Sequence, residues 1–126
     1  MGVLDGKIAM VTGATSGIGR TVALSFASEG ARVVGCGRDA AALQSLDTEL
    51  GECGFAQRCD VAHEADIDAV VAAAVERFGG LDIAFNCAGM GGLSYIKDAN
   101  LELAENIWRT NVLGVLTCMK YQSRAM

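Results

Sequence analysis

The sequence contains no proline, one histidine and few aromatic residues, and its basic residues are not clustered. With a net charge of −5 at neutral pH, the chain attracts neither the phosphates of nucleic acids nor an anionic membrane surface. Its longest run without a polar residue, 69–75, is far shorter than a membrane span. We therefore expect no nucleic-acid partner and no membrane partner.

The cysteines are odd in number, 5, and none of them forms a C-x-x-C pair. This pattern argues against a disulfide framework and against a zinc site, so we expect no metal. It indicates reduced thiols in the cytoplasm, and the first residues show no secretory or myristoylation signal. We predict that all of them are small core residues: Cys36, Cys53, Cys59, Cys87 and Cys118.

Apolar runs and helical periodicities alternate along the chain, whose 126 residues are 52% hydrophobic. The runs predicted as strands are Lys7–Thr12, Arg32–Cys36, Phe55–Cys59 and Leu81–Phe85. The residues predicted to share a helix face are Ile18, Val22 and Phe26; then Leu43, Leu46 and Leu50 after an Asp39 N-cap; then Ile67, Val70, Val71, Ala74, Val75 and Phe78. A last, continuous helix is expected from an Asn100 N-cap to Met126.

This alternation, with short connections, is typical of right-handed βαβ units that form a parallel sheet with helices on both faces. We expect a doubly wound, Rossmann-like α/β fold with the strand order 3-2-1-4, ending at the long helix after the fourth strand. The length suits one domain over residues 1–126.

The segment TGATSGIG, residues 12–19, lies between the first strand and the first helix. Glycines there permit a tight turn and a close approach of backbone N–H groups to an anion, which the helix dipole also favours. A pyrophosphate is the expected ligand; the alternative is a turn that binds nothing. Ala14 and Arg20 break the P-loop pattern, and Val22 breaks G-x-G-x-x-G, which leaves T-G-x-x-x-G-x-G.

That segment resembles the cofactor loop of the short-chain dehydrogenase/reductase family, and three further segments agree in order and spacing. Asp60-Val61 is similar to the family's D-V pair, 86–89 (NCAG) to its N-N-A-G with Cys87 in place of the second Asn, and 111–114 (NVLG) to its N-V-x-G. The resemblance implies these cofactor-binding residues: Gly13, Thr15, Ser16, Gly17, Ile18, Gly19, Gly37, Arg38, Asp60, Val61, Asn86, Ala88 and Gly89.

The end of the second strand favours NADP(H) over NAD(H). A carboxylate there would bind the ribose hydroxyls and repel a 2′-phosphate, but the chain has Gly37 followed by Arg38. A guanidinium favours a phosphate through charge-assisted hydrogen bonds. Asp39, as an N-cap, should turn to its own backbone, and Arg20 could support the same phosphate less directly.

The resemblance implies hydride transfer between the nicotinamide and a small carbonyl or alcohol substrate, with Asn111 as one member of a catalytic tetrad. The family's Tyr-x-x-x-Lys pair is missing, since Tyr95 precedes Ala99 and Tyr121 precedes Ala125 at that spacing. Without that pair, Asn111 is more simply a helix residue satisfied by backbone groups.

We therefore interpret the chain as the cofactor-binding half of a reductase, cut before the catalytic half and inactive alone. The alternative is a non-catalytic NAD(P)-binding regulatory module. In relatives the last helix packs against a partner subunit, so we expect a homo-oligomer formed through that helix, and self-association of the chain.

Overall fold

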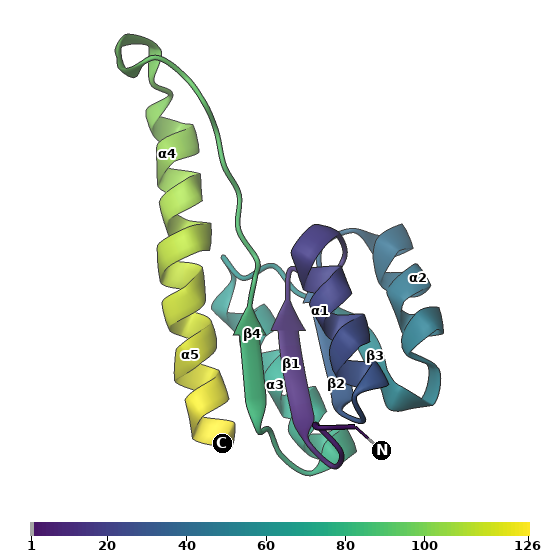
Figure 1. The fold of residues 1–126 in the computed structure, drawn as a ribbon. Coiled ribbons are helices and arrows are strands. Elements are labelled where there is room, and N and C mark those ends of the chain that lie inside the picture. The colour runs from purple at the N-terminus through teal and green to yellow at the C-terminus, as the bar shows by residue number, and fades with distance from the viewer. Residues whose placement is uncertain (1) are drawn as a thin grey trace.

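The computed structural model describes residues 2–126, which form one layered α/β unit (Figure 1). Its strands are β1 (Ile8–Thr12), β2 (Arg32–Gly37), β3 (Gly54–Arg58) and β4 (Ile83–Asn86). Its helices are α1 (Gly17–Ser28), α2 (Ala40–Leu50), α3 (Glu64–Phe78), α4 (Leu101–Trp108) and α5 (Gly114–Ala125), with short helical turns η1 (Gly51–Cys53), η2 (Ile96–Asp98) and η3 (Arg109–Leu113). Each predicted strand and helix is present, with boundaries within a few residues of those expected.

The sheet is parallel and has the order β3-β2-β1-β4, which confirms the predicted topology. In its register Ala9 lies opposite Val33 on β2 and opposite Ile83 on β4. Because parallel strands all run the same way, the loops after their carboxyl ends meet at one edge of the sheet.

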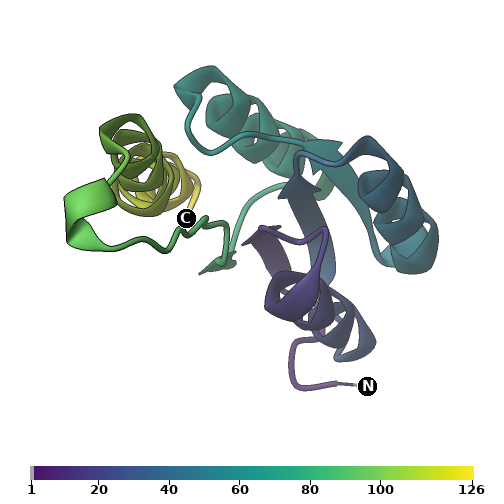
Figure 2. The ribbon, with the colours of Figure 1, turned by 90° about the horizontal axis from the view of Figure 1, so that it is seen from above.

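Helices cover both faces of the sheet, and each face has its own core. Viewed from above, α1 and α3 lie on opposite sides (Figure 2). One core joins α1 and α2 to Ala9, Val11 and Val33, and the other joins α3 and α5 to Met10 and Val34. Successive residues of β1 and β2 are therefore buried on alternate faces, which explains why these strands read as unbroken apolar runs.

The predicted helix ends follow from local hydrogen bonds. Asp39 Oδ1 accepts from the backbone N–H of Ala42 at 3.0 Å, and Asn100 Oδ1 accepts from that of Leu103 at 3.1 Å. Gly79 ends α3 with a φ of 95°, a left-handed conformation that favours glycine. Both predicted N-caps are confirmed.

Three details differ from the sequence-based expectation. Ile18 is 70% exposed, because α1 packs on the sheet through Gly19 and Ala23 instead. Cys53 is exposed in η1, and Cys87 is half-buried. The last helix is not a uniform α-helix, since five residues, η3, form a π-helical turn between α4 and α5.

The long α4–α5 column stands beside β4, and the chain from β4 rises along it before turning into α4 (Figure 1). Near its C-terminal end, in α5, this column is hydrogen-bonded to α3. Glu64 Oε1 accepts a hydrogen bond of 2.7 Å from the Tyr121 hydroxyl and one of 3.2 Å from Lys120 Nζ. These bonds to Tyr121 and Lys120 lower the pKa of Glu64. They stabilise the folded protein while the carboxylate is charged.

We expect Glu64→Gln to lower the melting temperature near neutral pH, with a difference that vanishes in acid. The pKa of Glu64 is lower in the folded than in the unfolded chain, so its stabilisation is present above the unfolded value, about 4.3, and is lost as the pH falls through the folded one. Thermal melts of both proteins across this range provide the measurement. Glu76→Gln, an exposed position on the same helix, is the control; an equal effect there would contradict the contact's role.

No helix within residues 2–126 combines the length and the apolar character that a membrane span requires. The same residues contain no group of three or more His, Cys, Asp or Glu side chains that could hold a metal ion.

Candidate functional site

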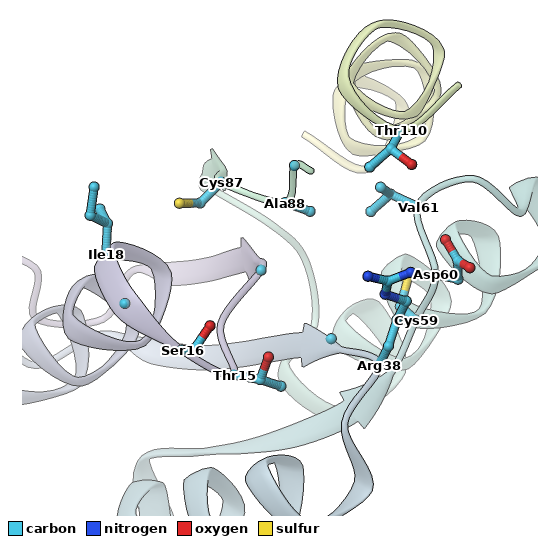
Figure 3. A pocket seen from close by; sticks show the side chains of 14 residues that line it. Thr15, Ser16, Ile18, Arg38, Cys59, Asp60, Val61, Cys87, Ala88 and Thr110 are labelled. Carbon is cyan, nitrogen blue, oxygen red and sulfur yellow. The ribbon is translucent and has the colours of Figure 1, made fainter. Parts of the chain in front are cut away.

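A cavity of about 360 Å³ opens at the carboxyl edge of the sheet, where the loops after all the strands meet (Figure 3). Most of the predicted cofactor residues line it: Gly13, Thr15, Ser16, Gly17, Ile18, Gly37, Arg38, Asp60, Val61, Ala88 and Gly89. Cys59, Cys87 and Thr110 complete the wall. The structure thus brings together residues from five separate segments. Gly19, Asn86 and Asn111 are not part of this wall.

The glycine loop presents backbone to the cavity at the start of α1. Gly13 and Gly17 have φ values of 62° and 54°, which side chains rarely adopt. A Cβ atom on Gly13 would lie 2.8 Å from the Ala88 backbone nitrogen, so the loop packs directly on the segment after β4. The N–H groups of the first turn of α1 have no partners within the helix. This arrangement can bind an anion.

Gly19 lies behind the loop instead of on the cavity. A Cβ atom there would overlap the carbonyl oxygen of Gly13. The residue is therefore required for the contact of α1 with its own preceding loop. The sequence alone predicts that Gly19 faces the ligand, which is a different physical role.

Arg38 is the exposed cation of the cavity, and it follows directly from the end of β2 (Figure 3). Within residues 2–126 its guanidinium forms no ion pair. The neighbouring Gly37 has no room for a side chain, because a Cβ atom there would overlap Thr15. The Asp39 carboxylate caps α2, as predicted. A positive charge is thus available at this end of the cavity.

Arg20 does not contribute to this end of the cavity. Its guanidinium donates to Ser45 Oγ at 3.0 Å and lies 3.4 Å from Glu49 Oε2, both on α2. The expectation that Arg20 supports the same phosphate as Arg38 is therefore wrong. Position 20 is one turn into α1, and the side chain leaves the helix toward its neighbour instead of toward the loop.

Asp60 and Val61 form the side of the cavity below the α4–α5 column. Asp60 Oδ1 accepts from the backbone N–H of Ala62 at 2.9 Å, which fixes the turn after β3. Val61 contacts Gly114, where a Cβ atom would be 3.0 Å from Val61 Cγ2. Thr110 of the π-helical turn faces the same space. Thr110 is not identified from the sequence, where its only signal is its position directly before Asn111.

Asn111 pairs with the backbone of the segment after β4. Its Oδ1 accepts from the Met90 N–H at 2.9 Å, and its Nδ2 donates to the Met90 carbonyl at 2.8 Å. Both polar groups of the side chain are therefore satisfied by backbone. Of the two roles suggested by the sequence, catalytic residue or helix residue bonded to backbone, this bonding corresponds to the second. The two bonds also attach the π-helical turn to the segment that forms the cavity wall.

Asn86 also uses its side chain within the protein. Its Nδ2 donates to Gln122 Oε1 at 3.0 Å, and its Oδ1 accepts from Gln122 Nε2 at 2.8 Å. Gln122 was not identified from the sequence. In the sequence, the only indication of its role is its position four residues after Cys118 and eight after Gly114, on the helix face that the structure buries.

Three of the cysteines, Cys36, Cys59 and Cys118, are buried, as predicted for them. The contact with the Cys59 thiol raises the pKa of the Cys36 thiol well above its usual value, and burial of Cys36 adds to this rise. Burial raises the pKa of Cys118 to about 12. Cys36 and Cys118 therefore stay protonated at neutral pH and pack as small apolar groups.

Comparison with known proteins gives consistent matches over the chain. The family model described as short chain dehydrogenase matches residues 7–126. A sorbitol dehydrogenase of Cereibacter sphaeroides is 37% identical over 98% of this chain and 48% of its own length. A 3beta-hydroxysteroid dehydrogenase of Mediterraneibacter gnavus is 43% identical over 86% of this chain and 39% of its own.

A crystal structure of a variant of actinorhodin polyketide ketoreductase with NADPH superposes with a TM-score of 0.91 at 38% identity. That match covers 99% of this chain and 49% of the ketoreductase. The chain spans about half the length of most of the curated relatives it matches.

Proposed function

The chain belongs to the short-chain dehydrogenase family, and from that premise we propose that it is the cofactor-binding half of an NADP(H)-dependent oxidoreductase. The reaction is a hydride transfer between the nicotinamide and a small carbonyl or alcohol substrate. The observation that carries the proposal is the cavity at the start of α1, which combines an anion-binding backbone with the free cation of Arg38. The cofactor, when bound, would donate the hydride to a carbonyl or accept it from an alcohol.

The residues that line the cavity fit a dinucleotide in three parts. The first turn of α1, with the loop from Gly13 to Gly17, would hold the pyrophosphate. Asp60 and Val61 would hold the adenine. Ala88 and Gly89, at the end of the cavity nearest β4, would lie along the remaining half of the molecule.

The preference for NADP(H) is supported by two neighbouring positions. Arg38 offers a guanidinium to a 2′-phosphate, and charge-assisted bonds of this kind are stronger than neutral ones. Thr15 fills the place that a carboxylate at position 37 would need in order to bind the ribose of NAD(H). The NADPH in the related ketoreductase structure is in keeping with this preference.

In this division of roles, the chain binds the cofactor, and the acid/base chemistry belongs to the half that the longer relatives contain. Neither Tyr95 nor Tyr121 is followed by a lysine at the spacing of the family's acid/base pair. We expect fluorescence titration to show saturable binding of one NADPH per chain, without oxidation of the NADPH when small ketones are added. Absence of binding would contradict the proposed function, and turnover by the chain alone would contradict the division of roles.

We also propose that the protein assembles into a homo-oligomer through the α4–α5 column. Four of its exposed apolar side chains follow one another at intervals of three or four residues: Trp108, Val112, Leu116 and Met119. Leu116→Glu should shift sedimentation toward the monomer, because a charge would be buried in the contact. The exposed Leu93, in the segment before α4, is the matched control as Leu93→Glu. Sedimentation unchanged by Leu116→Glu would contradict this interface.

A further inference from the structure

Gln122 is one of two buried polar residues among residues 2–126, the other being Thr12. Only 2% of Gln122 is exposed, and its amide is fully engaged. Besides its two reciprocal bonds with Asn86, its Nε2 lies 3.6 Å from the sulfur of Met10. A buried amide that lost these partners would be left unsatisfied, so the pair holds its two residues at a fixed distance.

The residue that Gln122 holds is the last one of β4. Asn86 lies opposite Thr12 in the parallel register. The residues that follow, Cys87, Ala88 and Gly89, form the cavity wall, and the Ala88 N–H donates to Thr12 Oγ1 at 3.1 Å. The position of Asn86 therefore sets where this wall begins.

Within residues 2–126, β4 lies at one side of the sheet. Its ladder partner in the described sheet is β1 alone. Its residues are half-buried, in contrast to those of β1, most of which are fully buried. The Asn86–Gln122 pair adds a contact to α5 at the point where the ladder ends.

The same helical column supports the other end of the wall through Asn111 and Met90. Asn111 and Gln122 are about three helical turns apart, or roughly 16 Å along the axis at 1.5 Å per residue. The stretch from Asn86 to Met90 reaches at most about 14 Å when extended. The two amides are thus spaced on the same scale as the segment, and each bonds one end of it.

We infer that Gln122 is a positioning residue of the cofactor site: its amide fixes Asn86, and with it the wall formed by residues 87–89. The inference rests on the proposed dinucleotide function and extends it to a residue outside the cavity. It also explains why Asn86 is not on the cavity wall, since both polar atoms of its side chain are bound to Gln122.

The sharpest test is Gln122→Glu, read as a function of pH. A protonated carboxyl can donate to Asn86 Oδ1 and accept from Asn86 Nδ2, as the native amide does. A charged carboxylate cannot donate, and burial disfavours it. The variant should therefore keep the pair with Asn86 in mild acid and lose it in base. If Gln122 only stabilised the helix, cofactor binding by the variant would not depend on pH in this way.

Two readouts are measured together: the Kd of NADP⁺ by calorimetry, and hydrogen exchange of the Ala88 amide without cofactor. For Gln122→Glu we expect a Kd within about twofold of the native value near pH 5.5 and about tenfold weaker near pH 8.5. Exchange at Ala88, relative to the native protein at the same pH, should accelerate over the same range. Gln44→Glu, on the exposed side of α2, should change neither readout.

A second variant covers the case in which Gln122→Glu does not fold in base. Gln122→Met has a similar length and cannot pair with Asn86, so it should weaken NADP⁺ binding and speed Ala88 exchange at every pH. Folded Gln122→Met with native affinity and native exchange would overturn the inference, and so would an equal loss in Gln44→Glu. If the native chain bound no dinucleotide, the proposed function would fail, while Ala88 exchange in the variants would still decide the role of Gln122.

Discussion

Arg38→Ala should weaken the binding of NADPH by about ten- to a hundredfold and leave the binding of NADH within about twofold. The 2′-phosphate is the only group that separates the two cofactors, and Arg38 is the exposed cation of the cavity. This range corresponds to about 1.4–2.7 kcal/mol, the size of the loss expected when a hydrogen bond to a charged group is removed. Isothermal titration of both cofactors against both proteins is the measurement.

Arg32→Ala is the matched control, because Arg32 is exposed at the opposite end of the same strand, β2. It removes an equal charge far from the cavity, so it should leave both affinities unchanged at moderate salt. If Arg38→Ala weakened the two cofactors equally, or if Arg32→Ala reproduced its effect, the NADP(H) preference would not come from Arg38.

Gly19→Val should abolish the binding of both cofactors. Even the Cβ atom of the new side chain would overlap the carbonyl oxygen of Gly13, so the loop could not keep its native path over the start of α1. The pyrophosphate site is built from that path and not from the Gly19 surface, so the loss should be the same for NADPH and NADH. Fluorescence titration, with circular dichroism to verify folding, measures it.

Gly80→Ala is the control for this substitution, since a Cβ atom there would meet open space and the residue does not have a positive φ. It should bind both cofactors as the native chain does. Native affinity in a well-folded Gly19→Val protein would mean that the glycine loop is a turn without a role in binding.

The parts of the fold that depend on regular periodicity could be predicted from the sequence. A buried parallel strand must be apolar on both faces, so runs such as Lys7–Thr12 are distinctive. Right-handed crossovers then leave few possible strand orders, and 3-2-1-4 is the order observed. The N-caps at Asp39 and Asn100 depend on one local hydrogen bond each, which sequence spacing alone indicates.

The parts that depend on tertiary contacts could not be predicted in the same way. Ile18 continues the apolar periodicity of α1, yet the close approach of Gly19 to the loop turns the helix so that Ile18 faces the cavity. Arg20 could bind a phosphate by its charge alone, but α2 offers it nearer partners. Gln122 and Asn86 lie far apart in the sequence, and no local pattern links two amides across that separation.

The most direct test of the dinucleotide site is a map of backbone amide shifts on addition of NADPH. We expect the perturbed amides to cluster at the carboxyl edge of the sheet, in residues 13–19, 37–38, 60–61 and 87–89. Gly30, Gly51 and Gly79, which follow the C-terminal ends of helices at the opposite edge, should not shift. Saturable changes confined to the carboxyl edge are the predicted result. Changes centred on the opposite edge, or no changes at saturating NADPH, would contradict the site.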